Sequence, residues 1–564
     1  MIRNFQTHQI RKTVELSDRL WDFTPMEGSQ KGITQKVWVP SCLETYPGME
    51  NYRGKAVYET SFFAEGTIRI CFKGVSHYAK VWIDGELSAE HYGSYGEFSA
   101  YARDLKAGIH SLRVEVDNQF KEEYSLDFPN DYYSYGGISR GVVLEQLNEV
   151  FVQWVHVTPI KKEHNDWEVK VEVCCRNLTN QVKDYELQIV LTENEKERKR
   201  HKADIKVPTG ESVVYSEILE IKDGISWTME NAFLYMVYTQ LVEKGTAVDD
   251  FIDRFGLRTV RIAGEKILFN EKLVNIKGVC RHEDHPDYGC ALPPAMIWND
   301  LKMIKDIGAN SVRTVHYPND EIFLDMCDEL GILVWEESHA RALDENQMRN
   351  PYFMEQSRQS IEEMIIHHYN HPSIYIWGML NECASETEYG RTCYQELFET
   401  MKELDTSRPH SFASCKFYDD KCQDLTDICA WNMYPYWYEE DTAAERIEKL
   451  RDWLDTKGNA MGKPLLVTEI GAGAVYGFRS TAKEVWSEEL QEEILRKQLT
   501  EIAESKDCIG MYIWQFCDVR VSREWAMRRP KSRNNKGIVD EYRKPKLSAA
   551  TVKEIFCKIS NYHN

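Results

Sequence analysis

The sequence has no long hydrophobic run. In its 564 residues no stretch approaches the roughly 18 apolar residues of a membrane-spanning helix. The N-terminal segment also lacks the run of about 7 to 15 apolar residues that is typical of a secretory signal. We therefore expect a protein that neither crosses a membrane nor is exported.

The sequence has fewer basic than acidic residues. The chain has 69 Lys and Arg against 91 Asp and Glu, which gives a formal net charge of −22. Such a chain repels nucleic acids and anionic membrane surfaces unless one segment is locally basic. We therefore expect neither as a partner.

The 15 cysteines form no CxxC pair, and their number is odd. This pattern argues against a disulfide framework and a zinc site, and it predicts reduced thiols in the cytoplasm. Glycine (31) and proline (17) are too few for a fibrous or low-complexity chain. The length and the apolar fraction of 42% instead predict a globular protein of several domains.

Alternating apolar residues dominate the first 150 residues. Leu112, Val114 and Val116 point to one side of a predicted strand, and Asp84-Gly85 is a strong hairpin signal. This pattern predicts a β-sandwich over residues 1–150.

A second alternating block occupies residues 151–258. Trp167, Val169, Val171 and Val173 share one face of a predicted strand, and the block has the size of an immunoglobulin-like sandwich. The charged tract at 193–202 is expected to be a solvated hairpin tip.

From residue 259 to 564, short apolar runs alternate with amphipathic helical segments. In the first of these segments Ile297, Leu301 and Ile304 recur at helical spacing. Eight βα units over about 300 residues predict a closed (β/α)8 barrel, with its chemistry at the C-terminal ends of the strands. The candidate strands lie at 273–280, 310–317, 332–338, 374–382, 410–415, 428–435, 464–471 and 509–516.

Two of these apolar runs lead into a glutamate, Glu382 in the fourth unit and Glu469 in the seventh. Both would lie at the same end of the barrel. Cleavage of a glycosidic bond requires such a carboxyl pair, one to protonate the leaving oxygen and one to attack the anomeric carbon. A glutamate at a strand end also occurs without function, and Glu336 and Glu337 of the third unit are two examples.

The motifs GVCRHEDHPDYG, DIGANSVRTVHYPNDE, IWGMLNE and PLLVTEIGAGA resemble those of the second family of glycoside hydrolases, which contains β-galactosidases and β-glucuronidases. They occur in the order and spacing of that family. The resemblance implies an N-terminal jelly-roll sugar-binding domain, an immunoglobulin-like sandwich and a catalytic TIM barrel. It also implies retaining hydrolysis, with Glu382 as acid/base, Glu469 as nucleophile and Asn381 on the sugar 2-hydroxyl.

The resemblance extends to further substrate-binding residues. It implies roles for His316 in RTVHYP, for Trp514 in YIWQF and for Asp131, which matches an aspartate that the first domain lends to glucuronidases. It also implies a role for Tyr434 and Tyr438, which resemble tyrosines near the nucleophile of the family. His282 and His285 lie three residues apart without a third ligand, so we expect no metal there.

The segment from Arg520 to Lys546 is the basic exception in this acidic chain, with ten Lys or Arg against three acidic residues. It contains RNNKG, which resembles the glucuronidase signature in which Asn534 and Lys536 would grip the substrate carboxylate. A lysine beside that carboxylate gives a charge-assisted hydrogen bond that a neutral sugar cannot make. Arg528 or Arg529 could assist. Segment 338–353 is expected to form an open rim.

These observations predict a cytoplasmic, retaining exo-β-glucuronidase that uses no metal and no redox cofactor. By resemblance to its relatives it would form dimers or tetramers. The alternatives are a β-galacturonidase or β-galactosidase of the same family, and a catalytically silent carbohydrate-binding protein. The residues leave open the choice between glucuronide and its C4 epimer, and whether a flavin binds away from the active site.

Overall fold

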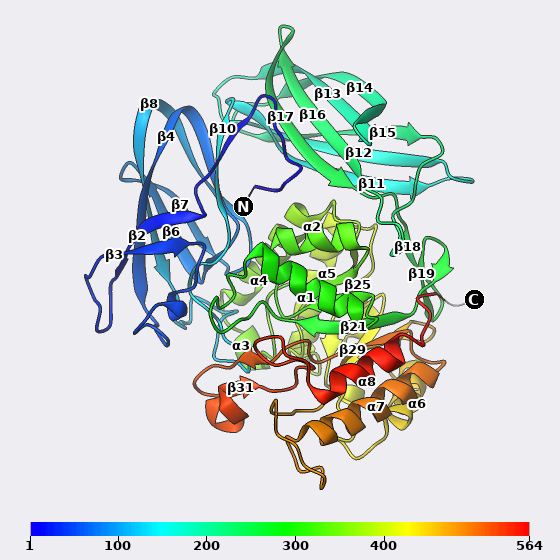
Figure 1. Ribbon diagram of the computed structural model, residues 1–564. Coiled ribbons are helices and arrows are strands. Elements are labelled where there is room, and N and C mark those ends of the chain that lie inside the picture. The colour runs from blue at the N-terminus through cyan, green and yellow to red at the C-terminus, as the bar shows by residue number, and fades with distance from the viewer. Residues whose placement is uncertain (1, 563–564) are drawn as a thin grey trace. The chain divides into compact units, whose positions relative to one another are not determined.

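A computed structural model describes residues 2–562, which fall into two compact units (Figure 1). Unit 1 comprises residues 1–119, 136–259 and 363–372, and unit 2 comprises residues 120–135, 260–362 and 373–564. Segment 120–135 therefore interrupts unit 1 in sequence and belongs to the unit that contains the predicted catalytic residues.

The first part of unit 1 is an eight-stranded antiparallel sheet in the order β1-β10-β4-β8-β6-β7, with β2 paired to β3 and β4. Leu112, Val114 and Val116 on β8 are fully buried, as their alternation predicts. The strands are β1 (Lys12–Glu15), β2 (Arg19–Pro25), β3 (Gln35–Val39), β4 (Lys55–Phe72), β6 (Tyr78–Ile83), β7 (Glu86–Tyr92), β8 (Phe98–Asp117) and β10 (Val142–Leu147). The short strands β5 (Val75–Ser76) and β9 (Gly137–Ile138) pair separately.

The second part of unit 1 consists of two antiparallel sheets around a hydrophobic cluster of their own, which includes the predicted face of Trp167 and Val169. One sheet is β11-β12-β15 and the other is β14-β13-β16-β17. The strands are β11 (Val150–Lys161), β12 (Trp167–Asn177), β13 (Lys183–Glu193), β14 (Lys196–Val207), β15 (Ser212–Ile221), β16 (Tyr235–Glu243) and β17 (Thr246–Phe255). This cluster is separate from the one formed by the first sheet, and the domain boundary near residue 150 stays a prediction.

The prediction for the charged tract at 193–202 is wrong in its extent. Only Asn194 and Glu195 form the turn, and residues from Lys196 onward belong to β14, the edge strand of its sheet. Charged side chains on an edge strand discourage its pairing with other chains, and this accounts for a strand that reads as a solvated loop.

Unit 2 contains the predicted barrel. Its parallel strands run in the order β25-β24-β23-β22-β21-β29-β28-β27-β26. β25 pairs with β24 and β26 pairs with β27, so these two short pieces on either side of Phe412 are one bent strand that closes the barrel. The strands are β21 (Ile276–Arg281), β22 (Ser311–Thr314), β23 (Leu333–Glu337), β24 (Ile374–Gly378), β25 (His410–Ser411), β26 (Ala413–Ser414), β27 (Cys429–Asn432), β28 (Leu465–Ile470) and β29 (Gly510–Ile513). All eight predicted strands are therefore confirmed.

Helices alternate with these strands. In α1 the predicted apolar positions Ile297, Leu301 and Ile304 are buried, and α7 packs against both α6 and α8 (Figure 1). The helices are α1 (Pro294–Asp306), α2 (Glu321–Leu330), α3 (Glu345–Met348), α4 (Phe353–His368), α5 (Glu388–Leu404), α6 (Ala443–Thr456), α7 (Glu488–Glu504) and α8 (Leu547–Phe556). β18 (Val260–Ala263), β19 (Lys266–Phe269) and β20 (Lys272–Leu273) precede the barrel, and β30 (Val519–Arg520) pairs with β31 (Arg533–Asn534) after its last strand.

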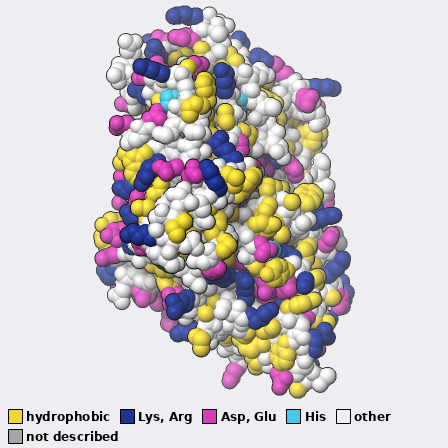
Figure 2. Space-filling model, turned by 60° about the vertical axis from the view of Figure 1, so that its left-hand side comes forward, with side chains coloured by type: hydrophobic (Ala, Val, Ile, Leu, Met, Phe, Trp, Pro, Cys, Tyr) yellow, Lys and Arg dark blue, Asp and Glu magenta, His cyan; other side chains and the backbone are white. Residues whose placement is uncertain are grey.

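All 15 cysteines are free thiols, and most of them are buried, as predicted. On the face drawn in Figure 2, acidic and basic side chains are intermingled despite the net charge of −22. Among the described residues, no helix combines the length and the apolarity that a membrane crossing requires.

Candidate active site

The two predicted catalytic carboxyls lie at the C-terminal end of the barrel strands. Glu469 is on β28 and is 4% exposed, and Glu382 follows β24 by four residues. Leu380 and Glu382 have left-handed backbone conformations, with φ of 45° and 56°. Hydrogen bonds to neighbouring strand ends hold this turn: Asn381 N–H donates to Ala340 O (3.1 Å), and Glu382 N–H donates to Ala413 O (2.9 Å). Such strained turns are common where a side chain is held for function.

Arg313 on β22 connects the two carboxyls through side-chain amides. Its guanidinium donates to Glu469 Oε1 (3.1 Å) and to Asn381 Oδ1 (2.8 Å). Asn432, at the end of β27, donates to both Asn381 Oδ1 and Glu382 Oε1 at 2.9 Å. The Nδ2 atom of Asn381 is buried with no hydrogen-bond partner among the described residues, so it is available to a ligand.

The carboxyl of Glu469 lies between two donors. Tyr434 O–H donates to Glu469 Oε2 (2.6 Å), on the opposite oxygen from Arg313. Burial and then the charge of Glu382 raise the pKa of Glu469 to about 8, while Arg313 opposes this shift. Glu469 therefore keeps a proton at neutral pH in the free protein.

His316 and Trp514 form a flat aromatic platform. Their rings stack with centroids 5.1 Å apart and an interplanar angle of 16°, and His282 meets Trp514 edge-on at 5.4 Å. Burial lowers the pKa of His316 well below its usual value and the pKa of His282 to about 3, so both rings are neutral. The Nε2 atoms of both rings are buried and have no partner among the described residues.

A basic wall of Lys536, Arg529 and Tyr438 lies beside Tyr434. Lys536 is 3% exposed, and its ammonium donates to the Tyr438 hydroxyl (2.9 Å). The ammonium also lies 5.2 Å from the ring centroid of Tyr434. Burial lowers the pKa of Lys536, and the charge of Arg529 adds to this. Among the described residues no carboxylate lies within 4.0 Å of its Nζ, and Asp131, whose charge raises the pKa of Lys536, is in contact with Arg341 and Arg529 instead.

Asp131 and Arg341 connect this wall to the acid/base candidate. Arg341 lies 2.9 Å from Asp131 Oδ1 and 3.6 Å from Glu382 Oε2. Asp131 also accepts from Arg529 (3.1 Å) and from the amide of Asn534 (3.2 Å). Burial acts to raise the pKa of Asp131, but Arg341, Arg529 and Lys536 lower it, so the carboxylate is ionised.

The predicted open rim at 338–353 is wrong in its first part. Ser338, His339 and Ala340 are buried, and Asn381 and Arg341 form an isolated β-bridge. Hydrogen bonds to segment 120–135 hold the rest: Asn350 donates to Glu122 O (2.7 Å). The first residues of the segment are therefore packed and carry Arg341 into the site, whereas Asp344, Asn346, Arg349 and Pro351 are exposed.

Contacts of 5.2 Å or less join all ten predicted site residues through their neighbours within unit 2. Four of the ten cations of the basic segment, by contrast, pair with acidic residues of unit 2. These pairs are Arg543 with Asp300, Lys546 with Asp518, Arg533 with Asp284 and Lys531 with Glu541.

Four residues of the site were missed by the sequence reasoning: Arg313, Glu337, Arg341 and Asn432. Arg313 could have been found, because an arginine on a strand otherwise buried on both sides needs a buried acidic partner. The sequence alone does not distinguish Glu337 from a strand-end glutamate without function, yet it accepts two N–H groups of Arg313 at 2.8 Å. Arg341 lies on irregular backbone and Asn432 on an ordinary apolar strand, so neither carried a sequence signal.

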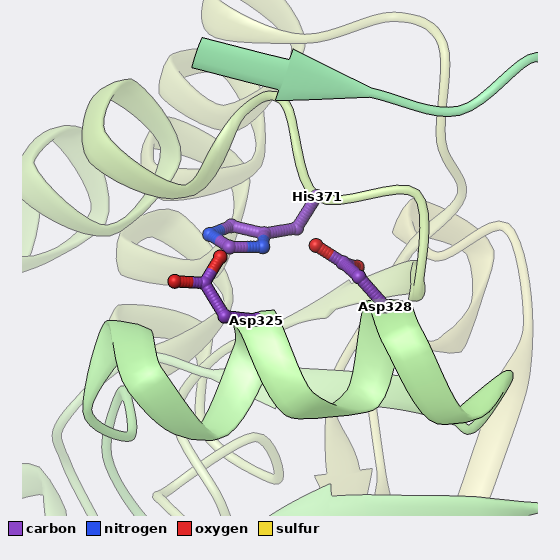
Figure 3. A group of neighbouring side chains, drawn as sticks. All are labelled: Asp325, Asp328 and His371. Carbon is purple, nitrogen blue, oxygen red and sulfur yellow. The ribbon is translucent and has the colours of Figure 1, made fainter. Parts of the chain in front are cut away.

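A second group of ionisable side chains, Asp325, Asp328 and His371, is drawn in Figure 3. Asp325 and Asp328 lie one turn apart on α2, and the backbone N–H of Ser373 donates to Asp328 (3.0 Å). His371 belongs to unit 1, and two carboxylates on one helix are common without an ion. We assign no metal to this group.

Comparison with known proteins places this site in a family. Residues 260–561 match the profile described as glycosyl hydrolases family 2, TIM barrel domain, and residues 150–258 match that of glycosyl hydrolases family 2. A crystal structure of a β-galacturonidase from Eisenbergiella tayi bound to galacturonate is 48% identical, with a TM-score of 0.97 and all of both chains covered.

More distant relatives are β-glucuronidases. The one from Paenibacillus borealis is 26% identical over 95% of this chain and 92% of its own. The one from Bacteroides fragilis is 28% identical over 97% of this chain and 82% of its own. The barrel profile alone covers more than half of the chain, and its matched region contains both carboxyls. The chain therefore belongs to glycosyl hydrolase family 2 and is a glycosyl hydrolase.

Proposed function

We propose that the protein is a retaining exo-β-uronidase, with Glu469 as nucleophile and Glu382 as acid/base. The observation that carries this proposal is the buried ammonium of Lys536, which has no carboxylate partner and lies against Tyr434, the donor to Glu469. A uronic acid brings a carboxylate at C6 that would supply the missing counter-ion. A neutral hexose would leave the ammonium buried and unpaired, which is costly.

In the first step, an oxygen of Glu469 forms a bond to the anomeric carbon while the glycosidic C–O bond breaks, and Glu382 gives its proton to the leaving oxygen. This requires the proton that Glu469 holds in the free protein to be on Glu382 when the bond breaks. Arg313 and Tyr434 donate to Glu469 and stabilise its ionised form in that state.

In the second step, a water molecule attacks the anomeric carbon and releases Glu469, and Glu382 takes up the proton of the water. Asn381 would donate its unpartnered Nδ2 to the sugar 2-hydroxyl, a contact that strengthens as the oxocarbenium-like transition state forms. The platform of His316 and Trp514 would lie under the sugar ring.

We propose galacturonides as the better substrates, because the 48% identity to a β-galacturonidase far exceeds the 26–28% identity to β-glucuronidases. Glucuronides are the second candidate, on the strength of those relatives. Assembly into dimers or tetramers, a jelly-roll first domain and a cytoplasmic location are further proposals that rest on the family resemblance and the free thiols.

The test is to assay aryl β-galacturonide, β-glucuronide and β-galactoside side by side with the full chain. We expect both uronides to be hydrolysed, with a higher kcat/KM for the galacturonide, and the neutral galactoside to be hydrolysed at least about 30-fold more slowly. A galactoside cleaved as fast as the uronides would overturn the uronidase assignment. A higher kcat/KM for the glucuronide would reverse the proposed choice of epimer alone.

A further inference from the structure

Glu337 is a buried carboxylate that the proposed mechanism does not use. It ends β23, is 1% exposed, and each of its two oxygens faces a different group. Arg313 donates through Nε and a terminal N–H to Oε2 at 2.8 Å. His316 Nδ1 lies 3.2 Å from Oε1. The two partners of Glu337 are therefore one side chain that touches Glu469 and one that belongs to the aromatic platform.

The chemistry of these partners decides where the His316 proton lies. A guanidinium can only donate, so Oε2 is an acceptor. Burial raises the pKa of Glu337 to about 7 and Arg313 opposes this shift, so the carboxylate is ionised above that pH. An ionised carboxylate has no hydrogen to give, so the contact at Oε1 requires the proton on His316 Nδ1. A neutral imidazole then leaves Nε2 without a proton, as an acceptor. This Nε2 is the buried atom with no partner among the described residues.

We propose that Glu337 is a positioning residue that holds His316 in the tautomer whose Nε2 accepts a hydrogen bond from a substrate hydroxyl. This inference rests on the proposed function, because it places a sugar hydroxyl next to the platform. An unprotonated Nε2 needs a hydrogen-bond donor. The site therefore favours a substrate with a hydroxyl at the position of the sugar ring that faces His316.

Replacement by an amide tests the proposal, because Glu337→Gln has one acceptor and one donor where the carboxylate has two acceptors. Its oxygen must face Arg313, which is always charged, and its NH2 group must then face His316 Nδ1. Nδ1 becomes the acceptor and Nε2 acquires the proton. The variant therefore reverses the direction of the hydrogen bond that His316 offers to the ligand.

The first measurement is inhibition by non-hydrolysable S-aryl β-thiouronides with fluorine in place of the hydroxyl at C2, C3 or C4. Fluorine accepts weakly but cannot donate. At one ring position we expect fluorine to weaken binding about 10-fold or more in the wild type and less than about threefold in Glu337→Gln. A role limited to holding Arg313 would weaken all ligands together and leave these ratios unchanged, which would overturn the proposal.

Glu336→Gln is the matched control, since it makes the same change at the neighbouring buried glutamate of β23. We expect it to keep the wild-type fluorine ratios. The second measurement needs no ligand: ¹⁵N NMR of histidine-labelled wild-type protein, with the His316 signal assigned through its loss in His316→Asn. At pH 8.5 Nδ1 should carry the proton, since this pH is above the value of about 7 to which burial raises the pKa of Glu337.

A proton on Nε2 in the wild type would overturn the inference. If no thiouronide binds, the proposed function fails, and the tautomer is still decided by the spectrum of the free protein.

Discussion

The site has two regions that meet at Tyr434. One holds the carboxyls Glu382 and Glu469, and the other is the basic wall of Lys536, Arg529 and Tyr438. Burial has opposite consequences in these two regions. At the carboxyls it raises the pKa of Glu469, so this carboxyl keeps a proton at neutral pH. At the wall it lowers the pKa of Lys536, which disfavours the ammonium while no anion is present. The carboxyls are thus prepared for proton transfer, and the wall is prepared for an anionic ligand.

This contrast separates chemistry from recognition. Damage to the carboxyls should reduce turnover of every substrate, whereas damage to the wall should change which substrate is turned over. The variants below address the two regions in turn.

Glu469→Gln should have the largest effect, because a neutral amide cannot form the bond to the anomeric carbon. We expect kcat to fall by about 10⁴-fold or more on all substrates, with the thermal unfolding midpoint little changed. Mass spectrometry after reaction with a 2-deoxy-2-fluoro uronide that traps the intermediate should place the label on Glu469. Label on Glu337, Glu336 or any other carboxylate would contradict the assignment.

Glu382→Ala should be the next most damaging change, and its effect should depend on the leaving group. Alkyl and sugar aglycones need a proton on the departing oxygen, so their kcat/KM should fall by about 10²–10⁴-fold. Nitrophenolate can leave without that proton, so kcat/KM for nitrophenyl uronides should fall far less. Equal losses for both classes would show that Glu382 is not the acid.

Lys536→Ala addresses the wall. It should leave the substrate carboxylate buried without its partner, at a cost of about 2–5 kcal/mol, or roughly 30- to 5,000-fold in kcat/KM for the uronides. Any residual activity on the matching neutral sugars should fall little or rise. Lys544→Ala is the control, since Lys544 belongs to the same basic segment but is exposed. An unchanged uronide-to-hexoside ratio in Lys536→Ala would remove the basis for the uronidase proposal.

The fold could be predicted from sequence because its signals are local. Leu112, Val114 and Val116 alternate within one strand, and each barrel strand is a short apolar run between helices, so the pattern is visible in a few residues. The charged edge strand β14 was misread because its side chains face solvent, and only its backbone pairing with β13 identifies it as a strand.

The site was predictable only where residues lie in recognisable motifs, such as Glu382, Glu469 and Lys536. Its supporting contacts join residues far apart in sequence. Arg313 reaches Glu469 across 156 positions, and Arg543 pairs with Asp300 across 243, so the sequence could not show which cations were already neutralised. The sequence therefore shows that the segment is basic. It does not show which of its cations form internal ion pairs and which face the substrate.

The smallest effect concerns pH and separates the two regions once more. The raised pKa of about 8 at Glu469 means that this carboxyl keeps its proton up to that pH and loses it above. Because Glu382 needs this proton for a demanding leaving group, kcat/KM should fall as the pH rises through about 8, with a slope of about tenfold per pH unit.

Ionisation of Tyr438 is an alternative explanation for a fall in kcat/KM at alkaline pH. Burial opposes its ionisation, but the charges of Lys536 and Arg529 lower the pKa of Tyr438 to about 8 as well. The leaving group and one variant distinguish the two causes. If the carboxyl proton is responsible, kcat/KM should fall at alkaline pH for an alkyl uronide but not for an activated aryl uronide, and Tyr438→Phe should retain this fall on the alkyl uronide. If the fall occurs with both leaving groups and disappears in Tyr438→Phe, the wall and not the carboxyls sets the alkaline limit of activity.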